Sequence, residues 1–330
     1  MADTFTALIL EQHENQVSAE VRSVPRDALP AGDVLVRVAY SGLNYKDGLA
    51  IRGKNKVVRS YPMVPGIDFV GTVEESASPA YAPGDAVILT GWGVGERHWG
   101  GMAQYARVKS VWLVPLPDGL TPRDAMAIGT AGFTAMLSLL ALEERGLAPD
   151  GREVLVTGAS GGVGSLAVAL LAALGYSVVA STGRADAHDY LRALGAKEII
   201  DRAPLTAESG PMGSARWAGA IDTVGGATLP GVIRTLAPNA SVAACGNAGG
   251  FDLPTSVLPF ILRGVNLLGI NSLDTPLEHR KVAWGRLARE LPRDTLQRTA
   301  HVVPLREAIP LAEQILRSQV RGHTVIDVNA

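Results

Sequence analysis

The N-terminal part of the chain alternates short apolar runs with glycine and proline. Such runs include DVLVRVAYSG (33–42), GIDFVGTVEE (66–75) and GDAVILTGWG (84–93). Runs of this length separated by turn residues are typical of short antiparallel strands. The pattern predicts a twisted, partly barrel-like antiparallel sheet over residues 1–125.

The periodicity changes after residue 121. The segment PRDAMAIGTAGFTAMLSLLALEERG (122–146) places apolar residues at helical spacing, and apolar strands then alternate with helical segments as far as SVAACG (241–246). This alternation predicts a parallel sheet covered by helices on both faces. We therefore expect an α/β protein with a β-rich domain over 1–125 and 298–330 and a nucleotide-binding domain over 126–297.

Composition narrows the class of protein. The 330 residues are 47% hydrophobic and 19% charged, with a net charge of −2, which argues against nucleic acid or an anionic membrane as the main partner. The N-terminus lacks a basic region, and the longest apolar stretch, Leu166–Leu174, is shorter than the ~20 residues that span a bilayer. The single cysteine, Cys245, excludes an intrachain disulfide and reads as the end of a buried strand, a poor nucleophile. These features predict a cytoplasmic enzyme.

A glycine-rich turn lies between an apolar strand and a helix in EVLVTGASGGVGSLAVALLAALG (153–175). Gly158, Gly161 and Gly164 stand at G-x-x-G-x-x-G spacing, with Gly162 in addition, a departure from the usual G-x-G-x-x-G. Glycines let the backbone approach a pyrophosphate, and the helix N-terminus offers unpaired N–H groups. The turn predicts a dinucleotide site; the alternative is a tight turn that binds nothing.

The next strand, YSVVASTGR (176–184), ends in residues that favour NADPH over NADH. A site for NADH usually places Asp or Glu here to bind the ribose hydroxyl. This chain has Ser-Thr-Gly-Arg (181–184) and no acid before Asp186. Because arginine binds phosphate in bidentate fashion, Arg184 suits a 2′-phosphate. The alternative is that Arg184 only caps a solvated loop.

A family resemblance runs through most of the chain. It is carried by SGLNYKD (41–47), YPMVPGIDFVGTV (61–73), LTGWGVGERHWGGMAQYARVK (89–109), VTGASGGVGS (156–165) and AACGNAGG (243–250). In these stretches the chain resembles the medium-chain dehydrogenase/reductase superfamily, in its zinc-independent, quinone-oxidoreductase-like branch. Within that branch it is most similar to the acrylyl-CoA reductases that use NADPH. The resemblance implies a Rossmann domain together with a GroES-like catalytic domain.

The resemblance also implies a reaction. Zinc members of the superfamily carry a His-Glu pair after a glycine, whereas Gly66 is here followed by Ile67 and Asp68, so we expect no catalytic zinc. The implied reaction is hydride addition to a short 2-enoyl-CoA, acrylyl-CoA foremost, giving propanoyl-CoA. Hydrogen-bond donors aimed at the thioester oxygen would lower its barrier, and the α-carbon must receive a proton.

Tyr45 is the candidate proton donor. A reference pKa of about 10 keeps a tyrosine protonated at neutral pH, and related 2-enoyl thioester reductases have a tyrosine near this place. Asn44 is expected to fix the substrate or the ribose, with Lys46 and Asp47 as a supporting pair; the catalytic candidates are Tyr45, Asn44 and Asp47. The alternative is that Tyr45 only stacks beside the nicotinamide while water delivers the proton.

A larger set of residues is expected to contact the cofactor, mostly by resemblance. Arg202, after the strand EIID (198–201), is a second candidate for the 2′-phosphate. The set comprises Tyr45, Thr130, Ser160, Gly161, Gly162, Val163, Thr182, Gly183, Arg184, Arg202, Asn247, Ile261, Ser272 and Asn329.

A cationic loop, RGKNKVVR (52–59), follows the Tyr45 segment. Phosphates of a CoA thioester would be attracted to Arg52, Lys54, Lys56 and Arg59. The alternative is an ordinary solvated loop. Arg321 and His323 are weaker candidates for the same contact. His98 is expected to order its own loop through a hydrogen bond, and Trp92 and Trp99 either wall an acyl pocket or anchor that loop.

Two other functions fit parts of the sequence. A quinone oxidoreductase would need NADPH and an aromatic slot, but neither thioester-binding cations nor a proton donor at Tyr45. A noncatalytic NADPH-binding or structural protein would keep the glycine turn without needing the cluster around Tyr45. Relatives in this branch form dimers by pairing the edge strands of their nucleotide-binding sheets. The apolar segment Val265–Leu273 predicts such an edge here, and therefore a homodimer.

Overall fold

The computed structural model describes residues 3–14, 16–207 and 210–330, and its α/β fold divides into two units. Unit 1 consists of Met1–Ala131, Ser272–Ala288 and Leu296–Ala330. Unit 2 consists of Gly132–Asn271 and Arg289–Thr295. The predicted combination of an antiparallel sheet with a parallel, nucleotide-binding sheet is confirmed.

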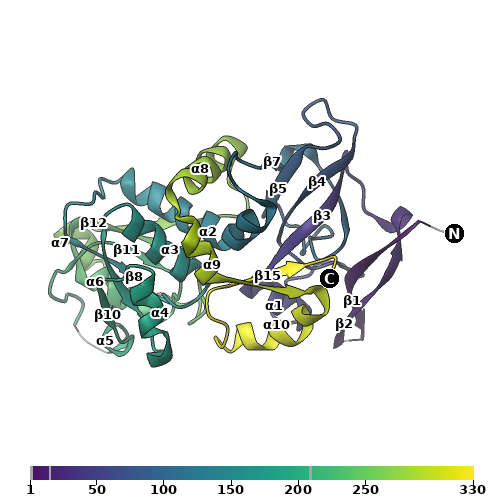
Figure 1. Cartoon of the computed structure of the whole chain (residues 1–330). Coiled ribbons are helices and arrows are strands. Elements are labelled where there is room, and N and C mark those ends of the chain that lie inside the picture. Colours follow the sequence, from purple (N-terminus) through teal and green to yellow (C-terminus); the bar gives the residue numbers. More distant parts are fainter. Residues whose placement is uncertain (1–2, 15, 208–209) are drawn as a thin grey trace. The chain divides into compact units, whose positions relative to one another are not determined.

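Unit 1 is built on a seven-stranded sheet in the order β14-β15-β3-β4-β5-β7, with β6 paired to β3. Only β14 and β15 run parallel; the other pairs are antiparallel. The C-terminal strand β15 pairs with β3, so the yellow end of the chain lies beside a purple strand in Figure 1. The strands are β3 (Val34–Leu43), β4 (Asp68–Ser76), β5 (Ala86–Thr90), β6 (Tyr105–Val108), β7 (Val114–Pro115), β14 (Ala300–Pro304) and β15 (His323–Asp327).

A hairpin and several short helices complete unit 1. The hairpin strands β1 (Thr4–His13) and β2 (Gln16–Pro25) pair over their full length, and the buried face of β1 joins the core formed by the larger sheet. Helix α1 packs closely on α10, because a Cβ at Gly48 would lie 2.7 Å from the Ile315 side chain. The helices are η1 (Arg26–Ala28), α1 (Tyr45–Ile51), η2 (Ser110–Trp112), α8 (Leu277–Glu290), α9 (Arg293–Thr299), η4 (Leu305–Glu307) and α10 (Ala308–Leu316).

Unit 2 contains a six-stranded parallel sheet in the order β10-β9-β8-β11-β12-β13. Its strands are β8 (Glu153–Val156), β9 (Ser177–Ser181), β10 (Glu198–Ile200), β11 (Trp217–Asp222), β12 (Leu236–Ala244) and β13 (Asn266–Gly269). Numbered from β8, this order is 3-2-1-4-5-6, that of the dinucleotide-binding fold, in which the ligand lies at the carboxyl ends where the order reverses. The reversal here is between β8 and β11.

The helices of unit 2 are mostly the crossovers between these parallel strands. They are α3 (Gly162–Ala173), η3 (Ala185–Ala187), α4 (His188–Ala193), α5 (Ala203–Thr206), α6 (Thr228–Thr235) and α7 (Leu258–Arg263). Strand β9 is buried along its whole length, as expected for a strand covered on both faces.

Helix α2 (Pro122–Glu143) contains a kink that periodicity did not predict. Gly129, at φ 50° and ψ −159°, separates two helical segments. By length and composition α2 could cross a membrane, so the prediction that every apolar segment is too short to span a bilayer is wrong. Of its most apolar window, 83% is buried inside the protein, which is the behaviour of a core helix.

The division between the units differs from the predicted one in the segment Ser272–Ala288, which belongs to unit 1. Arg280 on α8 is 0% exposed and donates to the Thr90 carbonyl at 2.6 Å and to the Leu273 carbonyl at 2.8 Å. Because Thr90 ends β5, these bonds attach α8 to the sheet of unit 1.

Candidate active site and dinucleotide site

The segment around Tyr45 begins with a reciprocal cap. The Asn44 side chain accepts the backbone N–H of Asp47, and the Asp47 carboxylate accepts the backbone N–H of Asn44 at 2.9 Å. This capping box satisfies two N–H groups that the start of a helix leaves unpaired. It starts α1 at Tyr45 and explains locally why Asn44 and Asp47 flank the tyrosine.

Asp47 is buried beneath this turn. The side chain is 1% exposed, and its other oxygen accepts the backbone N–H groups of Gly66 and Ile67, each at 3.0 Å. Burial, and after it the nearby Asp68 carboxylate, raises the pKa of Asp47 to about 7. All its hydrogen bonds are internal, so Asp47 holds the Gly66 turn against α1.

Tyr45 itself is 38% exposed at the first position of α1. The expected pair of Lys46 with Asp47 is wrong: Lys46 instead forms an ion pair with Glu96 at 3.0 Å. Glu96 lies 50 residues further along the chain, in the loop after β5, so this partner has no local signal in the sequence.

Asp68, the first residue of β4, is 0% exposed and accepts a hydrogen bond from the Asn44 amide at 3.1 Å. The sequence suggested it only as the residue that follows Ile67 where zinc members carry a His-Glu pair. The signal available in the sequence was an acidic residue at this position without the histidine that precedes the acid in zinc members.

The cationic loop is largely exposed. Lys54, Lys56 and Arg59 are exposed, and Arg52 forms an ion pair with Glu313 on α10 at 3.3 Å. Lys54, Lys56 and Arg59 can therefore contact a phosphate while the ion pair between Arg52 and Glu313 stays intact. Its contact with substrate remains a prediction.

His323 is wrong as a candidate for contact with phosphates. Its side chain is 3% exposed, and its Nδ1 lies 3.2 Å from the Ala127 carbonyl. It begins strand β15, whose first four residues are all buried.

The GWGVGERHWGG loop is held by its own polar atoms. His98 Nε2 bonds to the Arg107 carbonyl at 2.7 Å, so the predicted ordering role is confirmed. The Trp99 indole donates to the Pro62 carbonyl at 3.0 Å. Trp92 has φ 57° and a backbone N–H bound to the Leu273 carbonyl. The Trp99 side chain therefore anchors this loop, and whether either tryptophan also walls an acyl pocket stays a prediction.

In unit 2, the glycine turn leads directly into α3. Gly158 has φ 58°, a left-handed conformation that favours glycine, and a Cβ at Gly164 would lie 2.3 Å from the Gly158 carbonyl oxygen. Gly161 is the N-cap of α3 and no side chain caps this end. Gly161, Gly162 and Val163 are partly exposed. Uncapped N–H groups at an accessible helix start fit the pyrophosphate of a dinucleotide.

The ends of β8, β9 and β10 converge on a second part of this site. The Ser160 and Thr182 hydroxyls lie 3.2 Å apart. Thr182 also accepts the backbone N–H of Arg184 at 3.2 Å. Arg202 packs against the same turn, since a Cβ at Gly183 would lie 2.9 Å from its Nε. Arg202 therefore lies against this turn, whereas the neighbouring Arg184 forms an ion pair with Asp186 at 2.9 Å. Contact of either arginine with a 2′-phosphate stays a prediction.

The remaining predicted cofactor residues lie in both units. In unit 2, Asn247 is exposed after β12, and Ile261 on α7 is 71% exposed. In unit 1, the Ser272 carbonyl accepts a hydrogen bond from Arg280 at 3.1 Å. Thr130 follows the α2 kink, and its backbone N–H donates to Asp68 at 2.7 Å.

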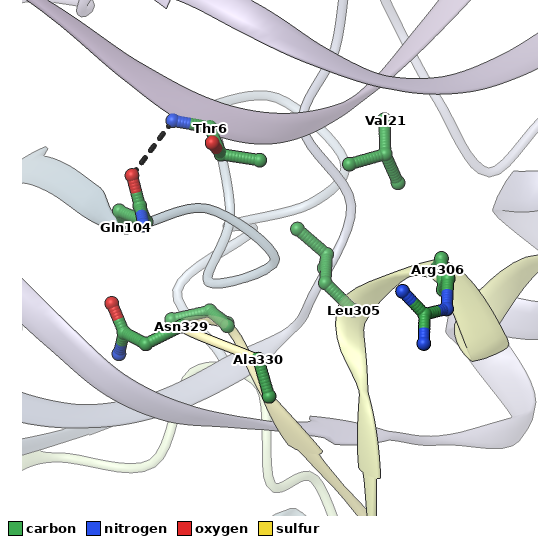
Figure 2. A pocket seen from close by; sticks show the side chains of 8 residues that line it. Thr6, Val21, Gln104, Leu305, Arg306, Asn329 and Ala330 are labelled. Carbon is green, nitrogen blue, oxygen red and sulfur yellow. Dashed lines mark hydrogen bonds between the residues drawn. The ribbon is translucent and has the colours of Figure 1, made fainter.

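Asn329 borders a pocket of about 250 Å³ in unit 1. Figure 2 shows this pocket between the hairpin, the Leu305 turn and the chain end. The Asn329 amide donates to the Val38 carbonyl at 3.2 Å, which ties the C-terminal residues to β3. The roles of all these residues in cofactor binding stay predictions.

Comparison with known proteins identifies the family. Residues 30–118 match the alcohol dehydrogenase GroES-like domain, and residues 162–288 match the zinc-binding dehydrogenase domain. The chain is 53% identical to a probable acrylyl-CoA reductase AcuI of Escherichia coli K12, over 98% of this chain and 99% of that one. This chain belongs to the medium-chain dehydrogenase/reductase family.

Other members of the family are similar over the same length. Acrylyl-CoA reductase AcuI of Ruegeria pomeroyi is 52% identical over 99% of this chain and 100% of its own. A putative quinone oxidoreductase YhfP of Bacillus subtilis is 44% identical over 99% of both chains. The crystal structure of E. coli K-12 YhdH with bound NADPH, 53% identical, superposes with a TM-score of 0.96 over 98% of this chain and 100% of that one.

Within residues 3–14, 16–207 and 210–330, no group of three His, Cys, Asp or Glu side chains is placed to hold a metal ion. Where zinc members carry their His-Glu pair, this chain has Ile67 and Asp68, and Asp68 accepts a hydrogen bond from the Asn44 amide. Zinc independence stays a prediction.

Cys245 is a free thiol whose pKa burial raises to about 12, so it is protonated at neutral pH.

Proposed function

We propose that this protein is an NADPH-dependent reductase of short 2-enoyl-CoA thioesters that converts acrylyl-CoA to propanoyl-CoA. The observation that carries the proposal is the identity of 52–53% with two proteins named as acrylyl-CoA reductases, over 98–99% of the chain. The Rossmann-type strand order and the uncapped α3 start supply a site that fits the cofactor.

NADPH, when bound, supplies the hydride that adds to the β-carbon of the substrate. The chain itself must bind the thioester, stabilise the negative charge that develops on its oxygen and protonate the α-carbon. Tyr45 carries a hydroxyl on a partly exposed side chain at the start of α1 and serves as the proton donor. The Asn44 amide has a second N–H beyond the one bound to Asp68, and donates it to the substrate or the ribose.

The exposed cations of the loop after α1 recognise the CoA moiety. Lys54, Lys56 and Arg59 attract its phosphates, while Arg52 holds the loop to α10 through Glu313. The 2′-phosphate of NADPH lies between Arg184 and Arg202. The enzyme needs no zinc and works in the cytoplasm.

Comparing substrates and a tyrosine variant tests this proposal. The assay measures NADPH oxidation by ultraviolet absorbance. We expect rapid oxidation with acrylyl-CoA and little oxidation with a benzoquinone. Tyr45→Phe should lower kcat for acrylyl-CoA about 100-fold, the usual contribution of a positioned acid. Tyr40→Phe, a change to a partly buried tyrosine on β3, is the matched control and should leave kcat within about 2-fold of wild type.

Each contrary result has a distinct meaning. Quinone turnover without thioester turnover would overturn the substrate assignment and favour the quinone oxidoreductase function, which the 44% identity to YhfP supports. Unchanged turnover in Tyr45→Phe would make water the proton donor and leave the substrate assignment intact.

We also propose that the enzyme is a homodimer formed through β13. This strand is one of the two edges of the unit 2 sheet, and unit 2 exposes several large apolar side chains. They are Phe251, Leu253, Val257, Ile261, Leu262 and Leu267.

Light scattering coupled to gel filtration tests the dimer. We expect a mass near twice the 34.5 kDa of one chain at micromolar concentration. Leu267→Lys places a charge on the edge strand and should give single chains. Val282→Lys, a change at another exposed apolar residue on α8, should leave the dimer intact. A wild-type mass of one chain would contradict the proposal.

A further inference from the structure

Asp68 is the acceptor for three N–H groups in the interior of unit 1. One carboxylate oxygen accepts the backbone N–H of Gly42 at 2.9 Å. The other accepts the side-chain amide of Asn44 at 3.1 Å and the backbone N–H of Thr130 at 2.7 Å. The residue is 0% exposed and has no ion pair within the described part of the chain. A single buried carboxylate thus joins β3, the start of α1 and the α2 kink.

Because of Asp68, the Asn44 amide has one fixed orientation. Its oxygen accepts the Asp47 N–H in the capping box, and one of its two N–H bonds points at Asp68. Rotating the amide by half a turn would set its NH2 against the Asp47 N–H and its oxygen against the Asp68 carboxylate, losing both bonds. The direction of the second N–H of Asn44 is therefore set by Asp68.

Asp68 fixes Thr130 in a comparable way. Thr130 follows the kink at Gly129, where a helical segment restarts, and its N–H would otherwise be one of the unpaired donors of that start. The kink is closely surrounded: a Cβ at Gly129 would lie 2.6 Å from His323 Cε1 and 3.2 Å from the Asp68 carboxylate. The position of Thr130 therefore depends on Asp68 and on the buried His323 ring.

His323 supports this arrangement without adding a cation. Its Nδ1 lies 3.2 Å from the Ala127 carbonyl and donates to it, and its buried Nε2 has no hydrogen-bond partner in the described part of the chain. Burial lowers the pKa of His323, so the ring is neutral at neutral pH. The carboxylate of Asp68 is stabilised by N–H donors, whose directions it controls in return.

We propose that Asp68 is a positioning residue of the reductase, which orients the Asn44 amide toward the substrate and Thr130 toward the cofactor. The inference rests on the proposed function. Donors that are oriented before the substrate arrives stabilise developing charge without further reorganisation, so loss of Asp68 should lower kcat more than it lowers stability.

Asp68→Asn tests this proposal. An amide can keep its oxygen toward Gly42 or toward Asn44 and Thr130, but in either case its NH2 faces an N–H donor. We expect kcat for acrylyl-CoA to fall about 30-fold and the NADPH dissociation constant to rise about 5-fold. Ser41→Ala is the matched control, because the Ser41 hydroxyl is also 0% exposed and donates at 2.7 Å to the backbone carbonyl of Asp68, not to its carboxylate. It should lower the melting temperature while changing both constants by less than about 2-fold.

A double-mutant cycle shows whether Asp68 acts through Asn44. Asn44→Ala should lower kcat by a similar factor. The kcat of the double variant, Asn44→Ala with Asp68→Asn, should lie within about 3-fold of the kcat of the less active single variant. Losses that multiply would overturn the proposal, as would equal kinetics of Asp68→Asn and Ser41→Ala. If Asp68→Asn does not fold, Asn44→Ser takes its place: serine keeps an oxygen for the helix cap but has no amide for Asp68 to orient. Wild-type kcat in Asn44→Ser would then overturn the proposal, and a fall of about 30-fold would support it.

Failure of the proposed substrate can be told from failure of this inference. If the wild type does not reduce acrylyl-CoA, the substrate assignment falls, and NADPH binding then decides the role of Asp68. A 5-fold weaker affinity in Asp68→Asn with unchanged affinity in Ser41→Ala would support positioning of Thr130. Equal affinities would overturn it.

Discussion

Replacing both Arg184 and Arg202 with alanine is expected to raise the dissociation constant for NADPH about 1,000-fold and to change that for NADH by less than about 3-fold. Both residues follow the carboxyl ends of β9 and β10, where Arg202 lies against Gly183 and Arg184 forms an ion pair with Asp186. Hydrogen bonds to charged groups contribute about 1.5–3 kcal/mol each, so each single variant should lose roughly 30-fold. Isothermal titration with both cofactors measures the effect, and NADH reports whether the rest of the site is intact.

Arg216→Ala is the control for this experiment. Arg216 lies before β11 and pairs with Glu153 and Glu198, which begin β8 and β10, so it is at the amino ends of the same strands. Its loss should leave both affinities unchanged. Equal weakening of NADPH and NADH in the double variant would mean that the arginines support the turn but do not contact the 2′-phosphate.

Features that depend on neighbours along the chain could be predicted from the sequence. The Gly158 turn between an apolar strand and helix is a local pattern, and it leads into α3 as expected. The order of strands and helices in unit 2 follows from alternating periodicity in the same way. The edge position predicted for Val265–Leu273 is confirmed for β13.

Pairings between distant residues could not be predicted in this way. Lys46 meets Glu96 across 50 residues, Arg280 meets Thr90 across 190, and His323 meets Ala127 across 196. Each partner is set by the packing of whole elements, which periodicity does not encode. A basic residue in a sequence therefore reads as solvated even where, as with His323 and Arg280, the fold buries it.

The largest loss of stability is expected for Arg280→Met. The buried guanidinium donates to the carbonyls of Thr90, Ser272, Leu273 and Thr275. Methionine has a similar unbranched stem but no donor, so these buried carbonyls lose the hydrogen bonds that the guanidinium supplies. An orphaned buried acceptor costs about 1–3 kcal/mol, and we expect the free energy of unfolding to fall by at least about 3 kcal/mol.

Urea denaturation measures this loss against Lys281→Met, the neighbouring basic residue on α8. Lys281 is exposed and pairs with Glu278 within one helical turn, so its replacement should change stability by less than about 0.5 kcal/mol. Arg280→Lys should not restore the wild type, because an ammonium has three donors and cannot reproduce the planar fork that reaches both β5 and the Ser272 segment. If Arg280→Met were as stable as Lys281→Met, the attachment of α8 to unit 1 would depend on its apolar face, and the buried arginine would contribute no net stability.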